Sequence, residues 1–353
     1  MRFTKLFLPV LALLLLGAGC IGTKSKGTNA LDGGVFKSGN AGEIWNQMSA
    51  LPTNTGVANI GGTDVVLLEM DPQDPNAIYA GTREDGLIFT QDGAQSWQQP
   101  REAALRQGRI HALAINPKDV CTVYVAKGSQ LFKSIDCLRT FDKNVYTETR
   151  AEVFISFVEV DWFNPQIVWM ALSNGDLLKS TDGARTWNAA FRVGAPITSL
   201  LIHQKDSRRV LIGTQKLGLV KTVDGGKTWK QIIKELNAYE GAKRTERLFQ
   251  DAQSRRVFLV SKYGLLSSSD FGDTWNKVNT LTSPGQVHIP AAVTDPNNPN
   301  TIYYVAASTF YTSYDHGKTW TTKKLPSTRT PSSLLVDPRN GSVIYMGVQK
   351  LAE

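Results

Sequence analysis

Seven eight-residue segments carry the side chains best suited to a repeated chemistry. Each places a carboxylate or amide two residues after a first position that is Ser or Thr, and an aromatic ring five residues further on. A carboxylate placed in this way can hold a ligand, or it can accept hydrogen bonds from its own turn. The pairs are Asn40 and Trp45, Asp92 and Trp97, Asp136 and Phe141, Asp182 and Trp187, Asp224 and Trp229, Asp270 and Trp275, and Asp315 and Trp320.

The spacing of these octets favours a structural role. Most of them start 42–46 residues apart, and they follow the pattern Ser/Thr-x-Asp-x-Gly-x-Thr-Trp. Glycine suits a backbone with positive φ, and tryptophan can bury a large apolar area beside a sheet. We therefore interpret the octets as folding turns, with ligand binding as the alternative.

Signatures of catalysis and of metal binding do not stand out. The sequence has no phosphate-binding glycine loop, no Gly-x-Ser-x-Gly elbow and no His-Glu-x-x-His pair. Its four histidines lack ligand spacing. Carboxylates are plentiful, so a pair for glycoside hydrolysis stays open, although no motif marks one. We predict no catalytic residue, no metal and no cofactor, and we favour a non-catalytic protein.

A second set of turn signals, out of phase with the octets, indicates the elements that carry them. Turns such as Asp71-Pro72, Asn116-Pro117 and Asp295-Pro296 each separate two apolar runs of strand length. One period then contains strand A, a turn, strand B, a loop, strand C, the octet and strand D. Four strands in this period are typical of a propeller blade.

The two ends of the repeat complete one blade. "SSLLVDPRNGSVIYMGV" near the C-terminus supplies strands A and B, while "GGVFKS" and "EIWNQM" near the N-terminus supply strands C and D. Stacked blades bury the apolar faces that one blade alone would expose. The sequence predicts an all-β, seven-bladed propeller with four antiparallel strands per blade, closed by N- and C-terminal strands in one shared blade.

The octet is identified as the Asp-box, or BNR repeat, and residues 34–353 resemble the Asp-box propeller superfamily. That superfamily includes sialidases, sortilin-type domains, xyloglucanases and photosystem II assembly-factor propellers. The resemblance implies the fold, whereas activity depends on sites added to it. Sialidases have six blades and an Arg-Ile-Pro motif that this sequence lacks. Xyloglucanases use two propellers with carboxylates facing the cleft between them, and one propeller fits here.

The loops opposite the octets are rich in cations. Residues 205–262 alone hold 14 Lys and Arg against 6 Asp and Glu. Arginine suits bidentate capture of carboxylates or phosphates, while a solvated face that keeps the protein soluble is the alternative. Arg208 and Arg255, however, lie near the turns on the same face as the octets. This suggests that the cations gather along one side of the ring, across both faces, rather than on the loop face alone. We predict partner binding by Arg83, Arg106, Arg109, Arg150, Arg192, Lys216, Lys243, Arg244, Arg247, Lys262 and Tyr263.

The N-terminal segment reads as a targeting signal. Arg2 and Lys5 precede an apolar run and the small residues before Cys20, which is typical of a lipoprotein signal peptide over residues 1–19. Cys20 would carry the lipid, and residues 20–33 would form a flexible tether. Plain secretion is the alternative. The prediction is an extracytoplasmic protein of the bacterial cell envelope, held on a membrane by its lipid anchor alone.

The remaining cysteines, Cys121 and Cys137, lie sixteen residues apart and flank two strand-like runs. The envelope permits disulfides, so the two thiols could join across one hairpin or stay free.

These observations predict a monomeric, non-catalytic scaffold or assembly factor that docks partners through its basic loops. The partner would be an envelope or membrane protein, or an acidic peptide segment, and not a nucleic acid. The alternatives are a sialidase-like or xyloglucanase-like glycoside hydrolase and a glycan-binding module. Trp162 and Trp169, the tryptophans outside the octets, lie in strand-like sequence, which disfavours glycan binding.

Overall fold

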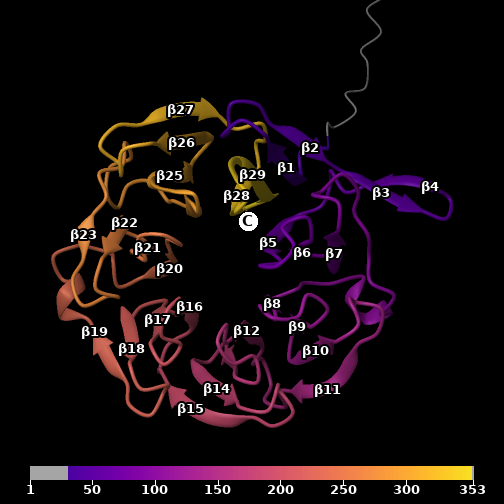
Figure 1. Ribbon diagram of the computed structural model, residues 1–353, viewed down its shortest axis with the longest axis horizontal. Coiled ribbons are helices and arrows are strands. Elements are labelled where there is room, and N and C mark those ends of the chain that lie inside the picture. Colours follow the sequence, from indigo (N-terminus) through magenta and orange to yellow (C-terminus); the bar gives the residue numbers. More distant parts are fainter. Residues whose placement is uncertain (1–30, 352–353) are drawn as a thin grey trace, which may run out of the picture. The chain divides into compact units, whose positions relative to one another are not determined.

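The computed structural model describes residues 31–351, and its compact unit begins at Asp32. The strands of this unit form a ring of antiparallel sheets around a central axis (Figure 1). The predicted signal peptide (1–19), Cys20 and residues 21–30 of the predicted tether lie outside the described residues. No helix in the described part of the chain is long and apolar enough to cross a membrane.

Seven blades make up the ring, so the predicted fold class is confirmed. Blade 1 contains, from the axis outward, β28 (Thr330–Asp337), β29 (Asn340–Gln349), β1 (Gly34–Ser38) and β2 (Asn46–Met48). Blade 2 contains β5 (Val65–Met70), β6 (Ile78–Thr82) and β7 (Leu87–Thr90). Blade 3 contains β8 (Ala112–Ile115), β9 (Val123–Lys127), β10 (Gln130–Ser134) and β11 (Asp142–Thr147).

The other four blades follow in chain order. Blade 4 contains β12 (Ile155–Val160), β13 (Val168–Leu172), β14 (Asp176–Ser180) and β15 (Asn188–Arg192). Blade 5 contains β16 (Ile197–Ile202), β17 (Val210–Thr214), β18 (Leu219–Thr222) and β19 (Lys230–Ile232). Blade 6 contains β20 (Thr245–Gln250), β21 (Val257–Ser261), β22 (Gly264–Ser268) and β23 (Asn276–Lys277). Blade 7 contains β24 (Ala291–Asp295), β25 (Asn298–Ala306), β26 (Thr309–Ser313) and β27 (Thr321–Lys324).

The second strand of each blade explains why the blades stack. In β6, β13, β17 and β21 every residue is buried. Both faces of these strands contact neighbouring blades, so their sequences are continuous apolar runs instead of alternating ones. The ring closes as predicted, because β1 pairs with β29 in a register that sets Gly34 opposite Val348.

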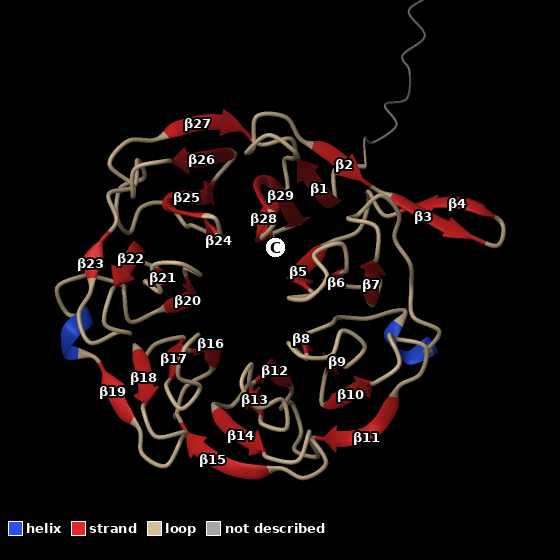
Figure 2. Ribbon diagram, viewed as in Figure 1, coloured by secondary structure: helices blue, strands red, loops and turns tan. Residues whose placement is uncertain are grey.

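Blade 2 departs from the regular pattern. Its fourth strand is reduced to a single bridge between Phe89 and Gln98. Just before this blade, the hairpin of β3 (Ala50–Thr53) and β4 (Gly56–Asn59) extends outward from the rim (Figure 2). The sequence pattern did not predict this hairpin, which accounts for the longer interval between the first two octets.

Adjacent blades are joined by polar contacts as well as by apolar packing. The Nζ atoms of Lys133 and Lys179 each donate to a glycine carbonyl in the octet of the next blade, at 2.8 Å in both cases. Lys179 also lies over the Trp169 ring, 4.6 Å from its centroid. In the other direction, the indole N–H of Trp187 donates to the Val145 carbonyl of the preceding blade at 3.2 Å. These contacts fix each octet against its neighbours.

Candidate binding site in the central channel and on the loop face

The octet side chains are occupied within their own turns. Asp224 Oδ1 accepts from the Thr222 hydroxyl at 2.8 Å and from the Thr228 N–H at 2.9 Å, while its Oδ2 accepts from the Thr228 hydroxyl at 2.6 Å. Equivalent hydrogen bonds from Thr140 and from the turn backbone lower the pKa of Asp136 to about 2. Carboxylates held in this way contribute to folding, and they leave little capacity for a ligand.

Two faces of the ring can be distinguished from backbone hydrogen bonds. The octets lie beside the A–B turns, as shown by the bond from Gly183 N to Gln166 O at 2.8 Å. We call this side the octet face. The B–C turns lie beside the D–A loops, as shown by the bond from Gly218 N to Lys243 O at 2.9 Å. We call this side the loop face.

A disulfide joins Cys121 to Cys137 on the octet face of blade 3. It connects the A–B turn to the octet of the same blade, and Cys137 N also donates to Cys121 O at 3.2 Å. This bond therefore supports the turn region and lies apart from the loop-face cations.

Two predicted partner-binding arginines are neutralised on blade 4. Arg150 and Arg192 both bind Asp176, each at 2.6 Å, and Arg150 also binds Glu148 at 2.7 Å. Hydrogen bonds from Arg192 and Arg150 lower the pKa of Asp176 to about 2. Because acids inside the protein already match these guanidinium groups, they are poorly suited to capturing an anion.

Two more predicted arginines hold loops in place. Arg83 donates to the Gln349 side chain at 2.6 Å and lies 3.7 Å from the Asp64 carboxylate. Arg106 Nε donates to the Pro100 carbonyl at 2.8 Å.

Five more of the predicted residues lie on the loops of blades 5 and 6. Neighbouring loops are joined by the bonds from Gly218 N to Lys243 O and from Lys262 N to Arg244 O. Arg244 is paired with Glu246 at 3.1 Å, whereas the ion pairs of the described residues include none to the three lysines. The Tyr263 ring packs edge-on against Tyr239 at 5.2 Å. We call this set the basic patch: Lys216, Lys243, Arg244, Lys262 and Tyr263.

A cavity lies at the centre of the ring, with a volume of about 1010 Å³. Its lining comes mainly from the innermost strands, and it includes residues of both faces. Arg109 and Arg247, two predicted residues, line it toward the loop face. Among residues 31–351, neither guanidinium forms an ion pair with a carboxylate. Burial and the nearby charge of Arg83 lower the pKa of Arg109.

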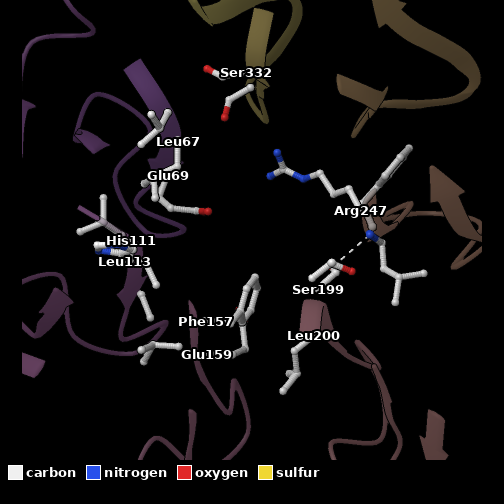
Figure 3. Close-up of a pocket in the computed structure, with 18 of the residues that line it drawn as sticks. Leu67, Glu69, His111, Leu113, Phe157, Glu159, Ser199, Leu200, Arg247 and Ser332 are labelled. Atoms are coloured by element: carbon white, nitrogen blue, oxygen red, sulfur yellow. Dashed lines mark hydrogen bonds between the residues drawn. The ribbon is translucent and has the colours of Figure 1, made fainter. Parts of the chain in front are cut away.

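Two glutamates in this cavity escaped the sequence analysis. Glu69 of β5 and Glu159 of β12 line the wall, and Figure 3 shows Glu69 and Arg247 extending into the cavity from opposite sides. Burial raises the pKa of Glu159 to about 8, and the charge of Glu69 adds to this effect. Burial also raises the pKa of Glu69, while Arg247 lowers it. A glutamate inside a mainly apolar first strand, as in "VVLLEM" and "ISFVEV", was the available signal.

The interpretation of Trp162 as a strand residue was wrong. It lies in the A–B turn after β12, lines the octet-face end of the cavity, and donates its indole N–H to His203 O at 3.0 Å. Phe163 beside it is 65% exposed. The argument against glycan binding that rested on Trp162 is therefore weaker.

Comparison with known proteins reveals likeness to several kinds of propeller protein. No family model matches the chain. A probable oligoxyloglucan-reducing end-specific xyloglucanase of Neosartorya fischeri is 27% identical over 191 residues. The match covers 49% of this chain and only 21% of that protein, so the chain corresponds to about a fifth of its length.

Two solved structures illustrate the range of this likeness. The GH74 xyloglucanase of Xanthomonas campestris has a TM-score of 0.65 and 16% identity, and the match covers 81% of this chain and 51% of that one. YCF48 bound to a D1 peptide has a TM-score of 0.62 and 11% identity, and the match covers 82% of this chain and 94% of that one. At such identities the likeness shows a shared propeller fold, and it extends to xyloglucanases and to a peptide-binding protein alike.

Proposed function

We propose that this protein is a non-catalytic scaffold that binds an acidic segment of a partner protein on its loop face. The observation that carries this proposal is the pair of unbridged guanidinium groups, Arg109 and Arg247, at the loop-face side of the cavity. The basic patch of blades 5 and 6 lies next to β20, which carries Arg247.

The chemistry of these groups favours an anionic ligand. A guanidinium can donate two parallel hydrogen bonds to one carboxylate, and such charged bonds contribute about 1.5–3 kcal/mol each. The nearby charge of Arg83 disfavours the charged form of Arg109, so an incoming carboxylate would relieve repulsion there. That YCF48 was solved with a D1 peptide supports a peptide ligand by analogy of fold.

The proposal is tested by fluorescence anisotropy with an acidic peptide ending in a free carboxylate. The double variant Arg109→Glu, Arg247→Glu should bind at least about tenfold more weakly, because two charged contacts become repulsive. A matched control is Arg185→Glu, an exposed arginine in an octet of the opposite face. Equal affinity for the double variant and the wild type would refute the proposal, as would equal binding of a neutral peptide.

A tether to the cell envelope is part of the same proposal. Cys20 would be lipidated after removal of residues 1–19, as the lipobox-like sequence suggests. Fractionation of cells that express the full chain should find wild type with membranes and Cys20→Ser released from them. Membrane association of both would contradict the lipid anchor.

A second candidate is a xyloglucanase-like hydrolase, which the partial match to a xyloglucanase and the two cavity glutamates favour. Glycoside hydrolysis requires one protonated and one ionised carboxyl group across the scissile bond. The raised pKa of Glu159 and the Arg247 charge near Glu69 would suit such a division. Release of reducing sugar from xyloglucan by the wild type, and its loss in Glu159→Gln, would establish this candidate in place of the scaffold.

A further inference from the structure

We infer that the central cavity holds a binding site for a small organic cation, with one basic nitrogen on an apolar body, between Glu69 and Glu159. This site lies deeper than the loop-face cations, and the inference does not depend on the peptide-binding function.

The register of the innermost strands places both glutamates in one layer. Glu69 pairs with Tyr79, and Glu159 pairs with Trp169, so each lies opposite the second residue of its neighbouring strand. The other blades contribute only apolar side chains to this layer. Ala114, Leu201 and Phe249 pair in the same way, while Val293 and Leu335 pair with Tyr303 and Tyr345 of the longer strands β25 and β29. The layer thus contains two carboxyl groups in an otherwise apolar ring.

Blade 3 separates the two glutamates, and its small residue in this layer is Ala114. Ala114, Leu201 and Phe249 also line the cavity. A short side chain between two acids leaves space at the wall, while the leucine and phenylalanine provide apolar surface. This arrangement fits a charged nitrogen near the acids and a hydrocarbon body beside them.

The two carboxyl groups have no hydrogen-bond or ion-pair partner in the described part of the chain, although the charge of Arg247 acts on Glu69 from across the cavity. Among residues 31–351, no hydrogen bond or ion pair satisfies the side chain of Glu69 or Glu159. Burial opposes the ionisation of both carboxyl groups, the charge of Glu69 adds to this effect on Glu159, and the charge of Arg247 favours the ionised form of Glu69. An ammonium group between them would supply Glu159 with the counter-charge that it lacks and donate up to three hydrogen bonds to the two carboxyl groups.

A metal ion is a poorer occupant than an ammonium group. Ca²⁺ takes six to eight oxygen ligands, and Mg²⁺ requires a near-octahedral set. In the part of the chain that the structure describes, no group of three or more His, Cys, Asp or Glu residues could hold a metal ion. Two carboxyl groups in an apolar layer match one cationic nitrogen better.

The octet-face end of the cavity favours the approach of such a ligand. Pro72, Pro117 and Trp162 line this end, and no lysine or arginine contributes to the lining there. The Trp162 ring offers a face for cation–π contact. At the loop-face end, by contrast, Arg83, Arg109 and Arg247 would repel a cation.

The test uses phenethylammonium as the probe and 2-phenylethanol as its neutral counterpart, in isothermal titration calorimetry on the mature protein. Binding requires ionised carboxylates, so probe affinity should rise at least about tenfold between pH 6 and pH 8, with proton release detected by comparing two buffers. The other titratable or charged groups that line the cavity are Arg83, Arg109, His111, Glu246, Arg247, His288 and Lys350.

Three isosteric variants make the result specific. Glu69→Gln and Glu159→Gln should each weaken the probe at least about tenfold, because one counter-charge is lost. Glu240→Gln removes an exposed acid outside the cavity lining and should leave affinity unchanged. Thermal unfolding of each variant confirms that it is folded.

Three outcomes would overturn the inference: equal affinity for 2-phenylethanol, no saturable binding at millimolar probe, or tighter binding of Ca²⁺ that displaces the probe. Failure of this site is distinguishable from failure of the proposed function. Arg109→Glu, Arg247→Glu should weaken peptide binding without weakening probe binding, whereas Glu69→Gln should do the reverse.

Discussion

Replacing Glu159 with glutamine should stabilise the protein in alkaline solution and leave it unchanged in acid. The folded-state pKa of this carboxyl is about 8, against an ordinary value of 4.5, because of burial and the charge of Glu69. The folded state therefore retains a proton that the unfolded state loses. Stability is fully present below about pH 4.5 and is lost as the pH rises through about 8. Glutamine cannot ionise, so the variant avoids this loss.

The magnitude follows from the two pKa values. A rise from 4.5 to about 8 corresponds to at most about 5 kcal/mol of unfolding free energy at high pH. The side chain remains in partial contact with the channel, where water screens its charge. We therefore expect Glu159→Gln to raise the unfolding free energy by about 2 kcal/mol at pH 9 and by less than about 0.5 kcal/mol at pH 5.

Urea denaturation at the two pH values measures this difference directly, with Glu240→Gln as the control for a change of one charge at the surface. A gain for Glu159→Gln that is equal at both pH values would refute the reasoning, because only ionisation can produce the pH dependence. A loss of stability at pH 9 would also refute it, by showing that the ionised form is better solvated or partnered than the structure indicates.

Three further predictions concern the scaffold. Lys179→Met should lower the unfolding free energy measured by urea denaturation by about 1 kcal/mol, because it removes the inter-blade hydrogen bond to Gly225 and keeps the apolar stem. An unchanged unfolding free energy would mean that water fully replaces this hydrogen bond. Cys121→Ser, Cys137→Ser should lower it by about 3 kcal/mol, given the sixteen-residue separation; reduction of the wild type should match this loss. Hydrogen bonds within the octets lower the pKa of their carboxyl groups, to about 2 at Asp136, so the ionised groups stabilise the fold above pH 3.8. Circular dichroism should therefore report unfolding as the pH falls from about 4 toward 2. A fold unaffected down to pH 2 would contradict this.

The fold was predictable because its signals are local and repeated. Turns such as Asp71-Pro72 and octets such as that of Asp224 mark strand ends through backbone geometry, which depends on a few adjacent residues. The terminal strands could be assigned to one blade because each half lacked the strands that the other supplied. The β3–β4 hairpin escaped prediction because it occurs once, so no period revealed it.

The site was predictable only in part, because it depends on which charges meet in space. Arg109 and Arg247 were found by composition and do line the cavity. Composition could not show that Asp176 would bridge Arg150 and Arg192, since these residues come from separate loops and strands. Glu69 and Glu159 lie ninety residues apart, and only the ring brings them into one layer.

The pairing of Gly34 with Val348 also governs when this protein can finish folding during its synthesis. Strand β1 emerges from the ribosome among the first elements, yet its inner neighbour β29 is made among the last. Until then, β1 presents an open hydrogen-bonding edge, which is the kind of surface that aggregates or recruits chaperones. Completion of the ring is therefore a late, long-range step, and truncation within β29 should leave a chain of nearly full length that stays vulnerable to proteases.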